Sequence, residues 1–294
     1  MEHQTPTPIT GHTALICLLG SPCAHSISPM MHNASFEALG LDYRYLAFDV
    51  NEATLPTAVA GLKALGARGF NLTMPDKNLM VSLCDDLSTA ARIIGAVNTV
   101  VNENGRLIGH NTDGIGYMQS VKDAGYDIIG KKMTLLGAGG AATAILVQAA
   151  LDGLKEISVF VRPTSRFYDR LVHTVDELTK ITDCKIKICD FSDAELLKQE
   201  LADSAILTNG TSVGMAPHED TCPVPEDLVF PDGLIVSDII YNPRETRLLS
   251  MAKHQGNPFF NGSYMLLYQG AEAFRLWTGK EMPVEQIKRE FFSK

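Results

Sequence analysis

The sequence predicts a two-domain α/β protein in which helices flank largely parallel sheets. Three observations lead to this prediction. The chain of 294 residues lies near the upper length that a single hydrophobic core serves. Apolar segments rich in β-branched residues alternate along it with segments of helical period. A glycine-rich turn near the middle of the chain follows one expected strand and precedes an expected helix.

The alternation begins in the first third of the chain. Expected strands cover residues 14–19, 43–50 and 69–72, and expected helices cover 29–39 and 55–65. Strand, helix and strand in this order form βαβ units, which place helices on the faces of a parallel sheet. An α/β domain is therefore expected before the glycine-rich turn.

A second series of strands and helices starts at the glycine-rich turn. Its expected strands are 133–136, 157–161, 186–189, 205–209 and 234–239, and its expected helices are 141–151 and 167–179. This series outlines a parallel-sheet nucleotide domain. We place the domain boundaries near Asp113 and Asn261. Residues 1–113 and 262–294 then form the first domain, with the C-terminal helical segment returning to it, and 114–261 form the second.

The composition limits the partners of the chain. The net charge of −9 argues against binding to nucleic acids or anionic membranes, because both require clustered Lys and Arg. A small-molecule partner fits better. No signal peptide or membrane span is recognisable, and the six cysteines lack metal-ligand spacing. We therefore expect no metal site, reduced thiols and a cytoplasmic location.

The glycine-rich turn carries the strongest functional signal. Strand residues 133–136 run into Gly137-Ala138-Gly139-Gly140-Ala141-Ala142, and a helix follows. Such a turn lets the backbone approach a pyrophosphate, while the helix N-terminus offers free N–H groups and a favourable dipole. The turn alone would need glycine without any ligand. With strand and helix on either side, we predict a Rossmann-type, doubly wound NAD(P)-binding domain.

The loop after the next strand bears on cofactor choice. NAD sites usually have an acidic residue there, which binds the ribose 2′-hydroxyl. No Asp or Glu lies between Ser158 and Tyr168, whereas Arg162 and Arg166 do. Two arginines suit the 2′-phosphate of NADP, although a solvated basic loop is the alternative. We expect NADP, with NAD as the alternative.

Polar residues of the first domain stand where its strands or helices end. Ser26 and Ser28 precede a helix, so their hydroxyl groups are candidates for binding a carboxylate; helix capping is the alternative. Lys77 follows Pro75, and we expect it in the first turn of a helix, whose dipole would lower its pKa.

An amide and a carboxylate occur in two later loops of the same domain. Asn98 and Asp113, taken separately, are typical turn residues. Lysine and carboxylate together, however, form a workable general acid/base couple for an alcohol whose carbon gives up hydride. Lys77 and Asp113 are therefore the candidate catalytic pair.

Eight ordered segments resemble one enzyme family. They are HSISP (25–29), NLTMPDK (71–77), GAVNTV (95–100), NTDGIG (111–116), LLGAGGAA (135–142), NGTSVGM (209–215), YNPRET (241–246) and GSYMLLYQGAEAFRLWTG (262–279). In order and over nearly the whole chain, they resemble shikimate dehydrogenase, most closely its quinate/shikimate dehydrogenase branch.

The resemblance implies reversible oxidation of the shikimate 3-hydroxyl group to 3-dehydroshikimate by NAD(P)+, a step of aromatic amino acid biosynthesis. It makes Lys77 and Asp113 the catalytic pair. It also implies substrate contacts by Ser26, Ser28, Thr73, Asn98, Tyr241 and Gln269. The implied cofactor contacts are Gly137, Ala138, Gly139, Gly140, Ala141, Arg162, Arg166, Ile239 and Gly262.

Two departures from the family pattern leave alternatives open. Asp76 replaces an aromatic or amide residue beside Lys77, and Val161, Pro163 and Thr164 alter the cofactor loop. The choice between NADP and NAD therefore stays open. So do a preference for quinate over shikimate, a non-catalytic dinucleotide-binding regulator, and a monomeric or homodimeric state.

Overall fold

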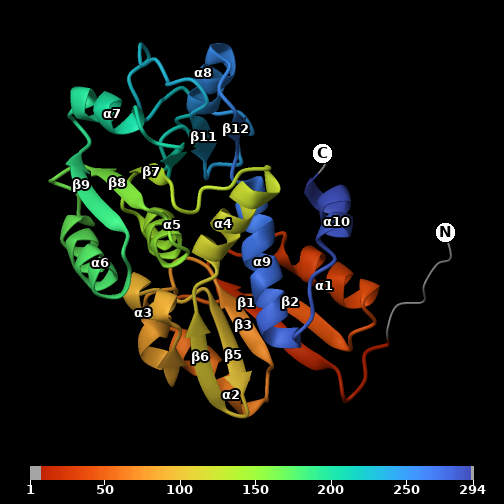
Figure 1. Ribbon diagram of the computed structural model, residues 1–294. Coiled ribbons are helices and arrows are strands. Elements are labelled where there is room, and N and C mark those ends of the chain that lie inside the picture. Colours follow the sequence, from red (N-terminus) through yellow and green to blue (C-terminus); the bar gives the residue numbers. More distant parts are fainter. Residues whose placement is uncertain (1–7, 293–294) are drawn as a thin grey trace. The chain divides into compact units, whose positions relative to one another are not determined.

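The computed structural model describes residues 8–292, which divide into two compact units (Figure 1). The first unit ends at Thr112 and resumes at Gln269, and the second comprises Asp113–Tyr268. The return to the first unit thus falls inside helix α9 (Ser263–Thr278). The predicted α/β class is confirmed, with one six-stranded sheet in each unit. Within residues 8–292, no helix combines the length and the apolar character needed to cross a membrane.

The sheet of the first unit is mixed and has the order β2-β1-β3-β5-β6-β4. Its strands are β1 (Ala14–Gly20), β2 (Tyr43–Asp49), β3 (Gly69–Leu72), β4 (Asp86–Leu87), β5 (Thr99–Glu103) and β6 (Arg106–His110). β5 runs antiparallel to both β3 and β6. The start of β5 and the end of β6 therefore lie at the same edge as the ends of β1 and β3. Loops from four strands meet at this edge.

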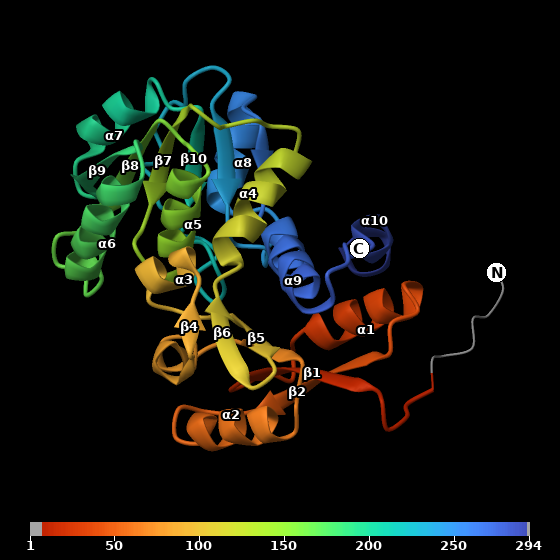
Figure 2. The same cartoon turned by 60° about the horizontal axis from the view of Figure 1, so that its bottom comes forward.

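Helices cover both faces of this sheet. In Figure 2, α1 lies on one face and α2 on the other. Leu55, Val59 and Leu62 of α2 join a buried cluster with Leu19 and Phe70 of the sheet. The helices of this unit are α1 (Ser28–Ala38), α2 (Leu55–Ala64), the 3-10 helix η1 (Leu79–Leu83), α3 (Thr89–Ile94), the end of α9, α10 (Val284–Ile287) and the π-helix η2 (Lys288–Phe292).

The second unit has an all-parallel sheet of order β12-β11-β10-β7-β8-β9. Its strands are β7 (Lys132–Leu136), β8 (Glu156–Val161), β9 (Lys185–Asp190), β10 (Ile206–Asn209), β11 (Ile235–Asp238) and β12 (Phe259–Phe260). The chain builds outward from β7 to β9, then returns to β10 on the other side of β7 and builds the opposite way. This reversal creates a switch point between β7 and β10, where doubly wound sheets bind ligands.

Helices enclose this second sheet as well. α4, α5 and α6 lie side by side in both views (Figures 1 and 2), while α7 and α8 pack with Leu136, Leu207 and Val236 in a separate core. The helices are α4 (Asp113–Asp123), α5 (Gly140–Leu151), α6 (Tyr168–Ile181), α7 (Ala194–Leu201) and α8 (Arg247–Gln255). The predicted Rossmann-type sheet is confirmed.

A fully buried histidine lies in the core of the first unit. His32 of α1 stacks on Tyr45, with ring centroids 4.6 Å apart, and lies 5.3 Å from the ring of Trp277. Its ring nitrogens have no hydrogen-bond partner among the described residues. Burial lowers the pKa of His32 from 6.5 to about 3, because the charged imidazolium would lose its hydration.

We expect His32 to weaken the protein in mild acid. The unfolded chain binds a proton near pH 6.5 and the folded chain only near pH 3. Above pH 6.5 His32 is neutral in both states and does not reduce the free energy of unfolding. As the pH falls from 6.5 toward 3, only the unfolded chain is protonated, so the free energy of unfolding decreases. At pH 5 the loss is about 2 kcal/mol, since one pKa unit corresponds to about 1.4 kcal/mol. Urea unfolding at pH 7.5 and pH 5 should therefore show a smaller acid loss in His32→Phe than in the wild type. Exposed His218→Gln is the control, and equal acid losses in all three proteins would contradict the expectation.

Candidate active site

Backbone hydrogen bonds hold together the loops at the common strand edge of the first unit. The N–H of Thr73, after β3, donates to the Leu19 carbonyl of β1 at 2.9 Å. The N–H of Leu72 donates to the Asn98 carbonyl at 2.9 Å, and the Asn98 N–H donates to the His110 carbonyl at 3.0 Å. Thr73 and Asn98, which were predicted separately, therefore flank the same strand end.

The side chain of Asn98 is fixed by hydrogen bonds at both ends. Its Oδ1 accepts from the Thr112 N–H at 2.9 Å and from Thr99 Oγ1 at 3.0 Å, and its Nδ2 donates to Thr112 Oγ1 at 3.0 Å. Asn71 continues this network, donating to Thr99 Oγ1 at 2.9 Å and accepting from the Tyr45 hydroxyl at 2.8 Å. The five side chains are buried, so the network holds the amide of Asn98 in one orientation.

Lys77 lies in a turn beside this network. Its carbonyl accepts from the Val97 N–H at 2.8 Å, which places Lys77 next to the segment that carries Asn98. The prediction that Lys77 lies in the first turn of a helix was wrong. Residues 74–78 form a turn, and only the short 3-10 helix η1 follows, from Leu79. Without a regular helix at Lys77, the dipole argument for this residue loses its basis.

Asp76, the departure noted beside Lys77, is a buried carboxyl group. Neither of its oxygens has a hydrogen-bond partner among the described residues. Burial raises the pKa of Asp76, and the negative charge of Glu52 raises it further. Both effects favour the neutral acid. The substitution by Asp76 noted in the sequence therefore does not supply a fixed negative charge beside Lys77.

The serine pair opens α1. The helix begins at Ser28, and the side chain of its N-cap residue makes no capping hydrogen bond. Ser26 Oγ accepts from the Ser28 N–H at 3.2 Å, while the Ser28 hydroxyl group hydrogen-bonds to Tyr45. Ser26 therefore satisfies one free N–H at the start of α1, whereas the Ser28 hydroxyl group is directed to Tyr45 and makes no cap. Burial raises the pKa of Tyr45 well above 10, so Tyr45 stays protonated.

Gln269 and Asp113 are carried by helices. Gln269 lies in α9 beside Gly270, where an added Cβ would stand 2.3 Å from Met31 Cε. This contact shows that α9 packs against α1 in the first unit. Asp113 is the first residue of α4 and directly follows Thr112, the partner of Asn98.

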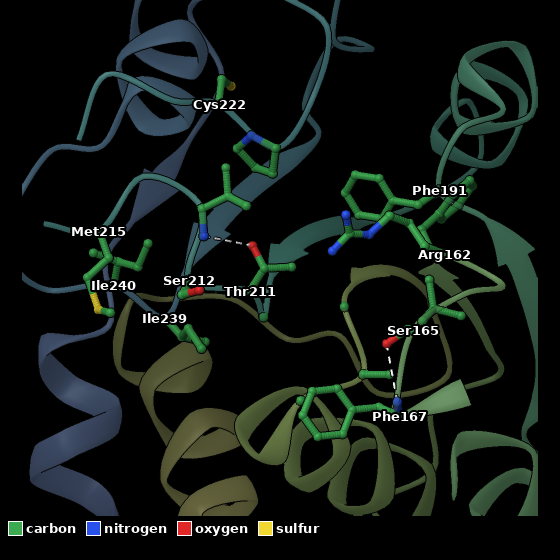
Figure 3. A pocket seen from close by; sticks show the side chains of 18 of the residues that line it. Arg162, Ser165, Phe167, Phe191, Thr211, Ser212, Met215, Cys222, Ile239 and Ile240 are labelled. Carbon is green, nitrogen blue, oxygen red and sulfur yellow. Dashed lines mark hydrogen bonds between the residues drawn. The ribbon is translucent and has the colours of Figure 1, made fainter. Parts of the chain in front are cut away.

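The second unit contains a cavity of about 940 Å³ at the carboxyl ends of its strands, including those that flank the switch point (Figure 3). Its size is within the range of small-molecule and cofactor sites. None of the lining residues is Asp or Glu. The lining residues are Gly137, Ala138, Gly139, Phe160, Val161, Arg162, Ser165, Phe167, Phe191, Gly210, Thr211, Ser212, Val213, Met215, Ala216, Cys222, Pro223, Ile239, Ile240, Tyr241 and Asn242.

The glycine-rich turn forms one wall of this cavity. Gly137 has φ +100°, and an added Cβ would stand 2.7 Å from Thr211 Cγ2, so both conformation and space require glycine. Gly137, Ala138 and Gly139 line the cavity, whereas Gly140 and Ala141 form the first turn of α5. The helix N-terminus and the open backbone suit a pyrophosphate group.

The loop after β8 supplies a cation and aromatic surface. Arg162 points into the cavity in Figure 3, and Ser165 and Phe167 line the same end. Arg166 is not among the lining residues: its guanidinium carbon lies 4.7 Å from the centre of the Phe167 ring, in a cation–π contact. Of the two predicted arginines, the structure thus places Arg162 in the cavity lining and Arg166 over the Phe167 ring.

The opposite wall follows β11. Ile239 and Tyr241 line the cavity, and the Tyr241 side chain is half exposed. Gly262 is not a lining residue, but an added Cβ would stand only 1.9 Å from the Ile239 carbonyl oxygen. The absence of a side chain at Gly262 therefore permits the position of Ile239.

Comparisons with known proteins agree with this architecture. Family models match residues 18–100 (shikimate dehydrogenase substrate binding domain) and 262–290 (shikimate 5′-dehydrogenase C-terminal domain). A shikimate dehydrogenase (NADP(+)) of Listeria monocytogenes serotype 4b is 52% identical over 293 residues, covering 99% of this chain and 100% of that protein. The chain belongs to the shikimate dehydrogenase family.

Two further members of the shikimate dehydrogenase family are similar over nearly their full length. The crystal structure of shikimate 5-dehydrogenase from Listeria monocytogenes, in complex with shikimate and NAD, has a TM-score of 0.92 at 53% identity, covering 96% of this chain and 97% of that one. A quinate/shikimate dehydrogenase of Escherichia coli (strain SMS-3-5) is 44% identical over 281 residues, covering 96% of this chain and 97% of that protein.

Several residues at the two sites were not predicted as site residues. In the first unit, Asn71 and Thr112 lie within the family motifs NLTMPDK and NTDGIG, so the motifs offered a signal for them. In the second unit, Phe191 lines the cavity from the loop after β9, where no motif marks it. Only the packing of parallel strands brings that loop to the cavity.

Proposed function

We propose that the chain catalyses the reversible, NADP-dependent oxidation of the 3-hydroxyl group of shikimate to 3-dehydroshikimate. The observation that carries this proposal is the cavity of about 940 Å³ with its glycine-rich wall, Arg162 and no lining carboxylate, in a member of the shikimate dehydrogenase family. When bound, the dinucleotide accepts hydride at the nicotinamide C4 position. Residues 1–113 and 262–294 are proposed as the substrate and catalytic domain, and 114–261 as the NAD(P)-binding domain.

Lys77 and Asp113 are proposed as the acid/base pair. In the oxidation direction, the pair removes the hydroxyl proton while the carbon loses hydride, and it returns the proton in reduction. Asn98 and Thr73 are proposed to orient ring hydroxyl groups, together with Asp113 and Gln269. The support is the hydrogen-bonded strand edge, which holds Asn98 rigid beside Lys77. Tyr241 is proposed as a further substrate contact.

Ser26 and Ser28 are proposed to bind the substrate carboxylate. Ser26→Ala and Ser28→Ala should each raise the KM for shikimate by an amount equivalent to roughly 1 to 3 kcal/mol, because a charge-assisted hydrogen bond is lost. The measurement compares shikimate with an analogue lacking the carboxylate, for which the effect should shrink. Equal losses for both ligands would count against a carboxylate site.

Arg162 is proposed to bind the 2′-phosphate of NADP, with Arg166 assisting from its place on Phe167. Arg162→Ala should raise the KM for NADP by about tenfold or more and leave that for NAD nearly unchanged. Added salt should weaken NADP binding in part, because it screens an exposed arginine–phosphate pair. If Arg166→Ala raises the KM for NADP and not that for NAD, Arg166 also binds the 2′-phosphate. Equal rises for both cofactors would show that these arginines only shape the loop.

Initial rates with shikimate and quinate, each with NADP+ and NAD+, test the proposed function. Shikimate with NADP+ should give the highest kcat/KM. A preference for quinate would favour the second candidate, quinate/shikimate dehydrogenase, which the 44% identity to the Escherichia coli enzyme supports. Dinucleotide binding with no turnover of either substrate would indicate a non-catalytic regulator.

The proposed enzyme works in the cytoplasm as a monomer or homodimer on free small molecules. Its six cysteines are unpaired, which suits a reducing compartment. Light scattering after size-exclusion chromatography would decide between the two states.

A further inference from the structure

A buried aspartate lies directly behind the cavity of the second unit. Asp238 ends β11, is only 1% exposed and is not among the lining residues. Its Oδ1 accepts from Asn209 Nδ2 at 3.1 Å and from the Ile240 N–H at 3.0 Å. Its Oδ2 accepts from Thr246 Oγ1 at 2.8 Å. One carboxyl group therefore connects the end of β10, the loop after β11 and the start of α8.

The first partner, Asn209, holds the cavity wall that follows β10. Its Oδ1 accepts from the Thr211 N–H at 3.0 Å and from Thr211 Oγ1 at 2.7 Å, and its Nδ2 donates to the Val213 carbonyl at 3.2 Å. Thr211, Ser212 and Val213 all line the cavity, and Figure 3 shows Thr211 and Ser212 at its wall. The amide of Asn209 thus clamps this segment, and Asp238 orients the amide.

The other two partners hold the wall that follows β11. The bond to the Ile240 N–H fixes the turn that begins the lining segment Ile239–Asn242, and the Ile239 N–H donates to the Asn209 carbonyl at 3.1 Å. Thr246 is the N-cap of α8, where it also accepts from the Leu249 N–H at 3.4 Å. The far end of the loop is therefore tied to the same carboxyl group.

Burial of the Asp238 carboxyl group reduces the stability of the fold, so packing alone does not explain an aspartate at this position. Burial raises its pKa to about 6, in spite of the hydrogen bonds that lower it. An apolar side chain of similar size would avoid the loss of carboxylate hydration. The contribution of Asp238 therefore lies in the directions that its hydrogen bonds impose on Asn209, Ile240 and Thr246.

We propose that Asp238 is a positioning residue for the dinucleotide. Through Asn209 and the Ile240 N–H, it holds the segments Thr211–Val213 and Ile239–Asn242 in the conformation that the bound dinucleotide contacts. The inference rests on the proposed function, because it assumes that the cavity binds NADP(H). It assigns Asp238 no contact with the cofactor or the substrate.

The test measures NADPH binding by fluorescence titration, together with steady-state kinetics. Asp238→Ala should raise the Kd for NADPH by about tenfold or more, while the KM for shikimate at saturating NADP+ changes less than about twofold. Asp238→Asn should restore the Kd to within about threefold, since its amide oxygen replaces Oδ1 as the acceptor for Asn209 and Ile240. Asn209→Ala should also raise the NADPH Kd, and the double variant should raise it by less than the product of the two single effects, because the Asn209–Asp238 hydrogen bond is counted in both.

Glu200→Gln is the matched control. Glu200 is a buried carboxylate of the same unit, paired with Lys132, the first residue of β7 and so at the opposite end of that strand from the cavity. Its substitution should lower the melting temperature and leave the NADPH Kd unchanged. Should Asp238→Ala not fold, Asn209→Ala carries the same comparison. The proposal is overturned if Asp238→Ala or Asn209→Ala binds NADPH as tightly as the wild type, or if Glu200→Gln weakens binding equally. A wild-type protein that does not bind NADPH would instead refute the proposed function.

Discussion

Lys77→Ala is expected to lower kcat by about two to four orders of magnitude, with little change in the KM for shikimate. A group that moves a proton acts mainly on the transition state, so its removal reduces turnover more than binding. Steady-state rates at saturating NADP+ and varied shikimate give both kcat and KM. Lys63→Ala provides the control, because Lys63 lies in the same unit in an exposed ion pair with Asp85. A change confined to KM would reduce Lys77 to a binding residue.

Asp113→Asn is expected to lower kcat as well, and the double variant tests the pairing. If Lys77 and Asp113 transfer the proton as one unit, removal of the second partner should cost little once the first is absent. The kcat of the double variant should therefore lie close to that of the worse single variant. Additive losses would separate the two residues into independent roles.

The largest expected effect on stability is that of Lys132→Ala, which should lower the free energy of unfolding by about 3 to 5 kcal/mol. Lys132 Nζ is buried and contacts Glu200 Oε2 at 2.6 Å, Asp203 Oδ1 at 2.5 Å and Glu156 Oε1 at 3.4 Å. Its removal leaves two nearly buried carboxylates, of Glu156 and Glu200, with one cation, Lys187. Urea unfolding followed by circular dichroism measures the loss.

Lys187→Ala is the control for this cluster. Lys187 contacts the same two glutamates, but its side chain is 51% exposed, so its loss should cost about 1 kcal/mol or less. If Lys132→Ala and Lys187→Ala lowered the free energy of unfolding by similar amounts, the burial of Lys132 would not explain its contribution. Burial alone would raise the pKa of Glu200, but the hydrogen bonds from Lys132 and Ser158 lower it to about 2. The stability that the ionised Glu200 gains from these hydrogen bonds is complete above pH 4.5 and is lost as the pH falls toward 2.

Much of the fold was visible in the sequence, because strands and helices leave local patterns. The apolar segments predicted at 14–19 and 133–136 became β1 and β7, and the glycine-rich turn joined β7 to α5 as expected. The β5–β6 hairpin was missed, although its turn, Asn104-Gly105, was recognisable. The helix expected at Lys77 is absent, because the carbonyl groups of Met74 and Lys77 accept hydrogen bonds from the distant Ser21 and Val97 N–H groups and not from a following helical turn.

By itself, the sequence determined the α/β class, the family and the glycine-rich dinucleotide turn, because each is written in residues that are close along the chain. Tertiary structure alone decided which side chains share a site. Arg162 and Arg166 are equivalent by sequence, yet one lines the cavity and the other stacks on Phe167. Asp238 showed no signal until its three hydrogen bonds were seen. Hydrogen bonds and burial depend on neighbours that folding brings from distant segments, and local sequence does not encode that proximity.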